Sequence, residues 1–261
     1  MVQKGGNKEL ETGIREAARL AEGWQTISIE VVRRLAARFG SVREIEMAAL
    51  QLEVVPSRYL RNMGTIGIKG QLKLLQGTAA VVGLGGLGGY VVEALARMGV
   101  GRLLLIDSDA FDEHNLNRQL LSSEANLGQG KAQAACQRVR EVNEAVEAVG
   151  MPKMLTEETL PDLLADADVV VDALDSLLVR LVLQDGAAVL GIPMVHGSIG
   201  GFLGQVMTIL PPDRGLHALY GDGRDLPEHG LEYEMGTPAP TPMAVAAWEA
   251  QEGIKVLTGE G

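Results

Sequence analysis

The chain has 261 residues and a net charge of −11, and 46% of its residues are hydrophobic. This composition is typical of a soluble globular protein with one large domain, or with one domain and a small accessory unit. The acidic balance argues against a broad surface for nucleic acid or anionic membranes, and no apolar run is long enough to span a membrane. The only cysteine, Cys136, excludes an internal disulfide and a four-cysteine zinc site, so we expect a cytoplasmic protein without zinc.

Residues 1–56 are predicted to form a helical N-terminal extension. The segment IEVVRRLAARFG has apolar residues at helical spacing and ends at Gly40. Ser41 and Glu44 then form the pattern of a capping box at the start of a second helix, and Pro56 closes the unit. Two helices around a glycine could also read DNA, but residues 1–50 have eight basic and seven acidic side chains. We therefore interpret the extension as a packing accessory.

From residue 78 onward, short apolar runs alternate with helical patterns. The runs are TAAVVG, RLLLID, ADVVVDAL and PMVHG, and helices are predicted over 86–98, 131–143 and 176–190. This alternation predicts a Rossmann-like, doubly wound α/β domain over residues 57–261. GQVMTILP follows PMVHGSIGG too closely for a crossover helix, so an antiparallel strand is expected there. A loop is predicted for 212–236, followed by a closing helix with Met243 and Trp248 in the core.

A glycine-rich stretch follows the first predicted strand of this domain. Gly83, Gly85 and Gly88 make a G-x-G-x-x-G pattern that opens the first helix. The glycines allow close approach of the backbone to phosphate, and the helix N-terminus offers unpaired N–H groups. Asp107 ends the next strand, where a carboxylate can accept from ribose hydroxyls. The motifs described so far fit a dinucleotide and ATP equally well. They also allow a glycine turn that serves only packing.

The residues after the ribose acid favour ATP. Asn115, Arg118 and Gln119 follow within twelve residues, and Lys131 opens the next predicted helix. A triphosphate needs cationic side chains more than a dinucleotide does, because it carries more charge. The run DVVVDALDS ends a later strand with two aspartates, of which Asp175 could hold Mg²⁺ against the phosphates.

These motifs together resemble the ThiF/MoeB/HesA family, the bacterial relatives of ubiquitin-activating enzymes. The matching segments are RYLRN, GLGGLG, DSDAFDEHNLNRQ, GQGK, DALDS and GQV, between residues 58 and 258. The resemblance implies that MgATP is used to adenylylate the C-terminal glycine of a ubiquitin-like sulfur carrier protein of the ThiS or MoaD type. The carrier would end in Gly-Gly, pyrophosphate would be released, and the enzyme would be a homodimer.

The resemblance also implies roles for the matching residues. Asp107 would bind ribose, Asp175 would bind Mg²⁺, and Arg61 would reach the ATP of the partner subunit. The implied catalytic residues are Arg61, Arg118, Lys131 and Asp175. The implied nucleotide-binding set is Gly83, Gly85, Gly86, Gly88, Asp107, Asp109, Asn115, Arg118, Gln119, Lys131, Asp175 and Ser176.

Two features depart from this family. The zinc cysteines common in it are missing, and no cysteine lies near EMGTPAPTP, where some members carry a reactive thiol. Cys136 lies inside a predicted helix, so we interpret it as a core residue and expect no catalytic cysteine. His196 is interpreted as hydrogen-bonded structure. Loop polarity explains four further polar residues better than a metal site does: Asp213, His217, Glu228 and His229.

Other functions stay open at this stage. One alternative is the related ATP-dependent dehydratase that cyclises threonylcarbamoyl-adenosine in tRNA, which also lacks zinc cysteines and has an aspartate–serine pair like Asp175–Ser176. The RYLRN segment and the acidic net charge argue against it. The remaining alternatives are a non-catalytic nucleotide-binding regulator and a NAD-dependent enzyme.

Overall fold

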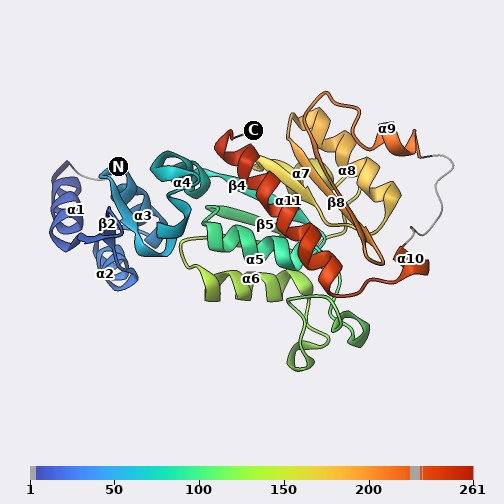
Figure 1. Cartoon of the computed structure of the whole chain (residues 1–261), viewed down its shortest axis with the longest axis horizontal. Helices are drawn as coiled ribbons and strands as arrows, with labels where there is room; N and C mark the ends of the chain where they lie inside the picture. The colour runs from blue at the N-terminus through green and yellow to red at the C-terminus, as the bar shows by residue number, and fades with distance from the viewer. Residues whose placement is uncertain (1–3, 224–229, 231, 261) are drawn as a thin grey trace.

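The computed structural model describes residues 4–223, 230 and 232–260. Its main body is a six-stranded sheet with the strand order β6-β5-β4-β7-β8-β9 (Figure 1). Neighbouring strands are parallel except β8 and β9, which pair antiparallel. This topology confirms the predicted Rossmann-like fold. The strands are β4 (Thr78–Val82), β5 (Arg102–Ile106), β6 (Glu147–Met151), β7 (Val169–Asp172), β8 (Met194–Gly200) and β9 (Leu203–Ile209).

Helices cover both faces of this sheet because its central strands are apolar on both sides. Along β4, Ala79 and Val81 belong to one core, and Ala80 and Val82 to the other. The first core is completed by α5 (Gly88–Met98), α6 (Lys131–Val142) and α11 (Pro240–Thr258). The second is completed by α7 (Leu160–Leu164) and α8 (Leu177–Leu190).

The order of the strands creates a topological switch point, hereafter the crevice, at the carboxyl edge of the sheet. From β4 the chain proceeds outward through β5 and β6, and then returns to β7 on the other side of β4. The connections on the two sides of β4 therefore diverge, and the carboxyl ends of β5, β4 and β7 lie side by side. Ligands bind at such switch points in doubly wound sheets.

Most of the predicted elements are present, with two differences. The strand β6 has no counterpart in the prediction, because its five residues are mostly half-buried or exposed and show no apolar run. The predicted loop over 212–236 contains two single-turn helices, α9 (His217–Tyr220) and α10 (Glu232–Met235). None of the helices in the described part of the chain is both long and apolar enough to cross a membrane.

The prediction that Met243 and Trp248 belong to the core is wrong. Met243 is 50% and Trp248 58% exposed. The face of α11 that packs on the sheet is made mainly of small residues, among them Ala246 and Ala250, so that the helix can approach the strands closely. The two large side chains lie off this face.

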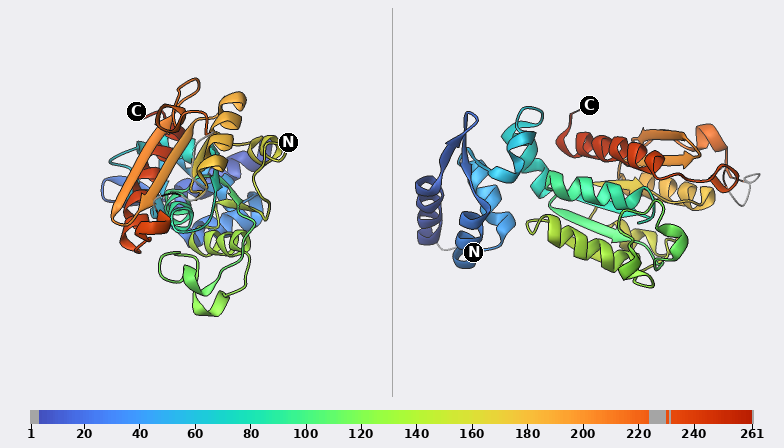
Figure 2. Two further views of the ribbon diagram at one scale, coloured as in Figure 1. Left: turned by 90° about the vertical axis from the view of Figure 1, so that its right-hand side faces the viewer. Right: turned by 60° about the horizontal axis from the view of Figure 1, so that its bottom comes forward.

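The N-terminal extension contains helices, as predicted, and also a small sheet. Two of its helices follow the predicted boundaries, and Ser41 and Glu44 form the predicted capping box. Its three strands are three or four residues long, too short to give a sequence pattern. The elements are α1 (Lys4–Ala17), β1 (Arg19–Ala21), β2 (Trp24–Ile27), α2 (Ile29–Phe39), α3 (Val42–Gln51) and β3 (Val54–Pro56). They enclose a hydrophobic cluster of their own and stand at one end of the molecule (Figure 2).

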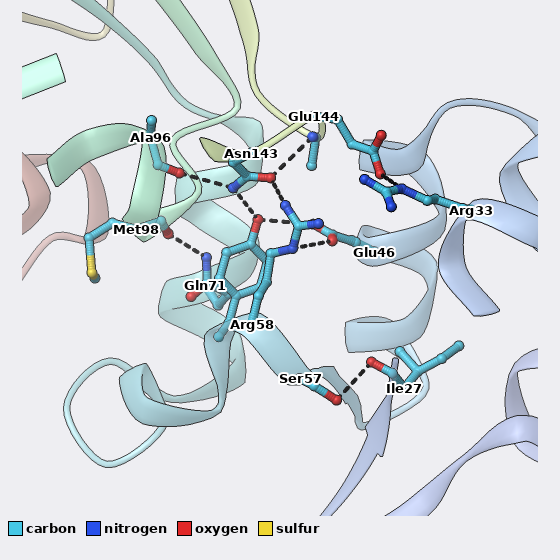
Figure 3. A network of polar contacts seen from close by, with 12 residues as sticks. Ile27, Arg33, Glu46, Ser57, Arg58, Gln71, Ala96, Met98, Asn143 and Glu144 are labelled. Atoms are coloured by element: carbon cyan, nitrogen blue, oxygen red, sulfur yellow. Dashed lines mark hydrogen bonds and ion pairs between the residues drawn. The ribbon is translucent and has the colours of Figure 1, made fainter. Parts of the chain in front are cut away.

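A buried polar network joins this unit to the main domain through the first two residues of RYLRN, which lie in the 3-10 helix η1 (Ser57–Asn62) (Figure 3). The Tyr59 hydroxyl donates to Glu46 at 2.9 Å and accepts from Asn143 at 3.0 Å. Arg58 donates to Asn143, and its Nε lies 3.3 Å from Glu46. Burial raises the pKa of both Glu46 and Tyr59 above their usual values. Because buried polar groups are costly when unpaired, this network fixes how η1 sits on the main domain.

Basic residues of the extension also face the main domain. Arg33 forms an ion pair with Glu144 at 2.5 Å. Arg43 donates to the carbonyl of Gly101 at 2.7 Å and lies 3.5 Å from Glu147. These contacts favour a packing role over DNA binding.

We propose a domain boundary near residue 56, supported by the separate hydrophobic cluster on its N-terminal side.

Candidate active site

The glycine loop connects β4 to α5 and lies against the carboxyl end of β7. Gly83 has a φ of +90°, and a Cβ there would lie 2.6 Å from the carbonyl oxygen of Ala173. A Cβ on Gly88 would lie 1.9 Å from the carbonyl oxygen of Gly83. Both glycines are therefore required by close packing. A Cβ on Gly85 would be in ordinary contact with the Gln119 side chain, and a Cβ on Gly86 with the Arg118 side chain. Gln119 and Arg118 therefore lie over the loop.

Asp107, at the end of β5, braces this loop. Its carboxylate accepts from the backbone N–H of Leu84 at 2.7 Å and from that of Asp109 at 2.8 Å. Burial raises the pKa of Asp107, while the ammonium of Lys131, 3.9 Å away, opposes that shift. The predicted ribose acid thus lies directly beside the glycine loop.

Lys131 is the first residue of α6 and reaches back to the same edge. Its backbone N–H donates to the carbonyl of Asp109 at 2.9 Å, and its Nζ lies 2.9 Å from the Asp109 carboxylate. The side chain of Lys131 is 9% exposed, whereas that of Asp109 is 67% exposed. The ammonium is therefore held at the site by a carboxylate that solvent or a ligand can reach.

The segment between β5 and α6 carries the other predicted phosphate ligands. It contains two short 3-10 helices, η2 (Glu113–Asn115) and η3 (Glu124–Asn126). Asn115 is buried, and its side chain caps η2 by accepting from the N–H of Asp112. Gln119 is also buried, and its Oε1 has no hydrogen-bond partner in the part of the chain that the structure describes. An unpaired buried acceptor beside the glycine loop is an indication of a ligand or of solvent at this position.

Arg118 lies within the electrostatic influence of Asp175. Its guanidinium donates to the carbonyl of His114 and to the Asn117 side chain, both at 2.9 Å. Burial lowers the pKa of Arg118, and the negative charge of Asp175 opposes the shift. Asp175 itself is exposed, three residues beyond the end of β7. Ser176 follows as the N-cap of α8, with its hydroxyl accepting from the N–H of Val179 at 3.5 Å.

The structure does not bring Arg61 to these residues. Its side chain is 85% exposed and pairs with Glu22 of the extension at 2.8 Å. Its neighbour Tyr59 packs on Gly99, which caps the C-terminal end of α5. The glycine loop is at the opposite end of α5, so Arg61 lies far from the loop of its own chain.

Four buried polar residues lie behind this crevice, on β7, β8, α8 and α11. His196 is hydrogen-bonded structure, as predicted: its Nδ1 lies 2.7 Å from the Asp172 carboxylate, and both residues are fully buried. Arg180 and Glu249 were not singled out in the sequence. A signal was present, because each is a charged residue within an apolar helical stretch, LLVRLVL and AVAAWEA. A charged residue within an apolar helical stretch is often buried, but the periodicity of the sequence does not show which residues surround it.

The remaining candidate groups behave as ordinary structure. Cys136 is buried, and burial raises the pKa of its thiol, which confirms the core interpretation. His217 pairs with Asp185 at 2.7 Å, and Asp213 accepts from the N–H of Leu210. Glu228 and His229 lie outside the described residues. Within residues 4–223, 230 and 232–260, no three metal-binding side chains gather in one place.

Comparison with known proteins places this chain in one family. Residues 59–261 match the ThiF family, and the chain belongs to it. The chain is 34% identical to the SAMP-activating enzyme E1 of Haloferax volcanii over 222 residues, covering 83% of this chain and 80% of that protein. It is 33% identical to the sulfur carrier protein ThiS adenylyltransferase of Escherichia coli over 205 residues, covering 77% and 81%. The predicted family and enzyme class are therefore confirmed.

A solved structure shows the same fold. The structure of tRNA N6-threonylcarbamoyladenosine dehydratase from E. coli, in complex with AMP, superimposes with a TM-score of 0.67 at 23% identity. The match covers 78% of this chain and 95% of that one. The match to the ThiF family begins at residue 59, so it does not include the N-terminal extension.

Proposed function

We propose that this chain uses MgATP to adenylylate the C-terminal glycine of a ubiquitin-like sulfur carrier protein of the ThiS or MoaD type, ending in Gly-Gly, and releases pyrophosphate. One observation carries the proposal: at the carboxyl edge of β5, β4 and β7, a glycine loop is surrounded by a ribose-type acid, two cations and an exposed carboxylate. The curated relatives that share the fold are named for adenylylation of carriers or for activation of SAMP.

The residues present fit ATP. Asp107 would bind the ribose, and the loop N–H groups with Lys131 and Arg118 would bind the phosphates. Lys131 is held by an exposed carboxylate that phosphate oxygens can replace, and the buried Gln119 oxygen has no partner among the described residues. Asp175 would hold Mg²⁺, since this ion is usually bound by one or two carboxylates together with substrate phosphates. When bound, Mg²⁺ would supply neutralisation of phosphate charge.

The chemistry needs no nucleophile from the protein. A carboxylate oxygen of the carrier's terminal glycine attacks the α-phosphorus of ATP and forms a new P–O bond. The bond between that phosphorus and the bridging oxygen breaks, and its electron pair leaves with pyrophosphate. The protein contributes orientation and fixed positive charge, chiefly from Lys131 and Arg118. The product is an acyl-adenylate, a mixed anhydride that a sulfur donor can attack.

A protein substrate is supported by an apolar surface beside the crevice. Pro242 of α11 lies against the glycine loop, because a Cβ added to Gly86 would contact the proline side chain. On the same helix Met243 and Trp248 are exposed, and Phe202 and Leu203 are 85% and 65% exposed where β8 turns into β9, two strands that pack against α11. Several large exposed apolar side chains on neighbouring elements are typical of protein-binding surfaces. The glycines in GSIGGFLG, residues 197–204, would allow the carrier tail to pass close to the backbone.

A second candidate is the tRNA dehydratase of the same superfamily. The Asp175–Ser176 pair and the likeness to the E. coli dehydratase structure favour it, although that likeness shows the fold alone. The net charge of −11 disfavours a tRNA surface. A regulator that binds nucleotide without turnover would retain the same crevice.

The phosphate site is tested by Lys131→Ala. Loss of this buried ammonium should slow carrier-dependent ATP–pyrophosphate exchange. The expected loss of transition-state stabilisation is about 2–4 kcal/mol, on the scale of one lost preorganised donor. The matched control is Lys69→Ala, an exposed lysine on α4 (Gly67–Gln76), which leads into the amino end of β4, away from the crevice. If the Lys131 variant folds normally and exchanges within a few-fold of the wild type, the assignment of the phosphate site is wrong.

We also propose a homodimer with composite sites, because Arg61 lies too far from its own glycine loop to act there. A mixture of Arg61→Ala and Lys131→Ala subunits should recover activity that neither variant has alone. Each heterodimer then has one intact site, with about half of the wild-type activity per dimer. Activity is measured on purified heterodimers carrying two different affinity tags. Heterodimers as inactive as their parents would mean that Arg61 does not act across an interface.

The enzyme is proposed to stop at the acyl-adenylate, because its only thiol is buried, with a raised pKa, on the core side of α6. Cys136→Ser should therefore keep pyrophosphate exchange, and thiocarboxylate should still form when a sulfur donor is supplied. Mass spectrometry of enzyme incubated with ATP and carrier, before and after reductant, checks this. A thiol-labile enzyme–carrier adduct in the wild type, absent from the serine variant, would make Cys136 catalytic.

A further inference from the structure

Four ionisable side chains are buried together directly behind the loop that carries Asp175. Asp172, His196 and Glu249 are fully buried, and Arg180 is 5% exposed. They come from β7, β8, α11 and α8, so this cluster joins four elements of the main domain. Burying so many polar groups is costly unless their arrangement is maintained by mutual contacts, and it adds little net stability. Their position next to the crevice suggests a role in its geometry.

Two of these side chains hold the backbone of one loop residue, Leu174, on both its N–H and its C=O side. The Asp172 carboxylate accepts from the backbone N–H of Leu174 at 3.1 Å. The Arg180 guanidinium donates to the backbone carbonyl of the same residue. Both polar backbone groups of Leu174 are thus held by buried charged side chains, and the next residue in the chain is Asp175.

Asp172 is itself fixed from two further directions. Its Oδ2 lies 2.7 Å from His196 Nδ1 and 3.9 Å from Arg180 Nε. The carboxylate therefore cannot turn without breaking contacts to β8 and α8. A side chain held in this way is a rigid support for the loop.

Glu249 closes the cluster from α11. A Cβ on Gly197 would lie 2.2 Å from the Glu249 carboxyl carbon, so the absence of a side chain at Gly197 makes room for this group. Burial raises the pKa of Glu249 well above its usual range; the Asp172 charge adds to the shift, and Arg180 opposes it. Arg180 is the positive partner of Asp172 in the cluster, with its Nε 3.9 Å from the Asp172 carboxylate.

By contrast, the side chain of Asp175 has no hydrogen bond of its own among the described residues, and it is exposed. Its direction is therefore set by the backbone that precedes it. We propose that Arg180 is a positioning residue, which with Asp172 holds the backbone of Leu174 and so orients the Asp175 carboxylate toward the bound metal–nucleotide. This inference rests on the proposed role of Asp175 in binding Mg²⁺.

The test compares Arg180→Met and Arg180→Lys with the wild type and with Arg140→Met, an exposed arginine on α6. Two quantities are measured: hydrogen–deuterium exchange of the peptide containing residues 172–176 in the ligand-free enzyme, and the Mg²⁺ concentration that gives half-maximal pyrophosphate exchange. For Arg180→Met, we expect faster deuterium uptake in that peptide and a half-saturating Mg²⁺ concentration roughly 10–100-fold higher, the usual effect of removing a support of a metal ligand. Binding of ATP without metal should change little. Arg180→Lys should show the same changes to a smaller extent.

The outcomes separate this inference from the proposed function. If Asp175→Asn leaves the Mg²⁺ dependence unchanged, the metal role of Asp175 is wrong, and the positioning role fails with it. If Asp175→Asn changes the Mg²⁺ dependence but the Arg180 variants do not, only the positioning role is overturned. A lower melting temperature and maximal rate, with unchanged deuterium uptake at residues 172–176, would show that Arg180 is merely structural. Should Arg180→Met fail to fold, Arg180→Lys is judged by the same two measurements.

Discussion

The approach of the glycine loop to the carboxyl end of β7 is the constraint on which the rest of the site depends. Gly83 and Gly88 leave no room for a side chain, and the backbone of Ala173 occupies the space that a Cβ on Gly83 would need. Since β4 lies between β5 and β7, this contact brings the ends of three strands together. Asp107 then fixes the loop from the β5 side, and the residues after β7 bring Asp175 within the electrostatic influence of Arg118. Larger side chains at these two glycines would separate the halves of the site.

Charge in this domain is distributed between groups that line the proposed nucleotide site and groups buried behind it. At the site, Lys131 and Arg118 are partnered by groups that a polyphosphate can replace, which suits a ligand with a large negative charge. Behind the site, Asp172 and Arg180 form contacts that no ligand can reach. A similar division exists at the junction with the N-terminal extension, where the buried Glu46–Tyr59 pair fixes η1 while Arg61 stays exposed four residues from its start. In both places, a buried network holds a short segment that carries one exposed side chain of the proposed site.

Much of this arrangement could be predicted from the sequence, because the strands of the sheet are continuous apolar runs and the site residues lie in motifs close to the strand ends. The strand β6 and the small N-terminal sheet could not, since short, half-exposed strands leave no periodic signal. The exposure of Met243 and Trp248 was missed because the buried face of α11 is selected by close packing of alanines rather than by hydrophobicity. The cluster around Arg180 combines three consecutive elements, β7, α8 and β8, with Glu249 of the distant α11, and its contacts depend on how these elements pack in three dimensions. The pairing of Arg61 with Glu22 is of the same kind.

The proposed adenylylation of a carrier C-terminus is tested most directly by ATP–pyrophosphate exchange. The assay uses a panel of purified ubiquitin-like carriers, each with its Gly-Gly end and with the final glycine removed, and threonylcarbamoyl-adenosine-modified tRNA for comparison. We expect exchange to require at least one carrier and to be lost when the terminal glycine is removed, while tRNA has no effect. Exchange that is independent of every carrier, or ATP turnover that depends on the modified tRNA, would contradict the proposal.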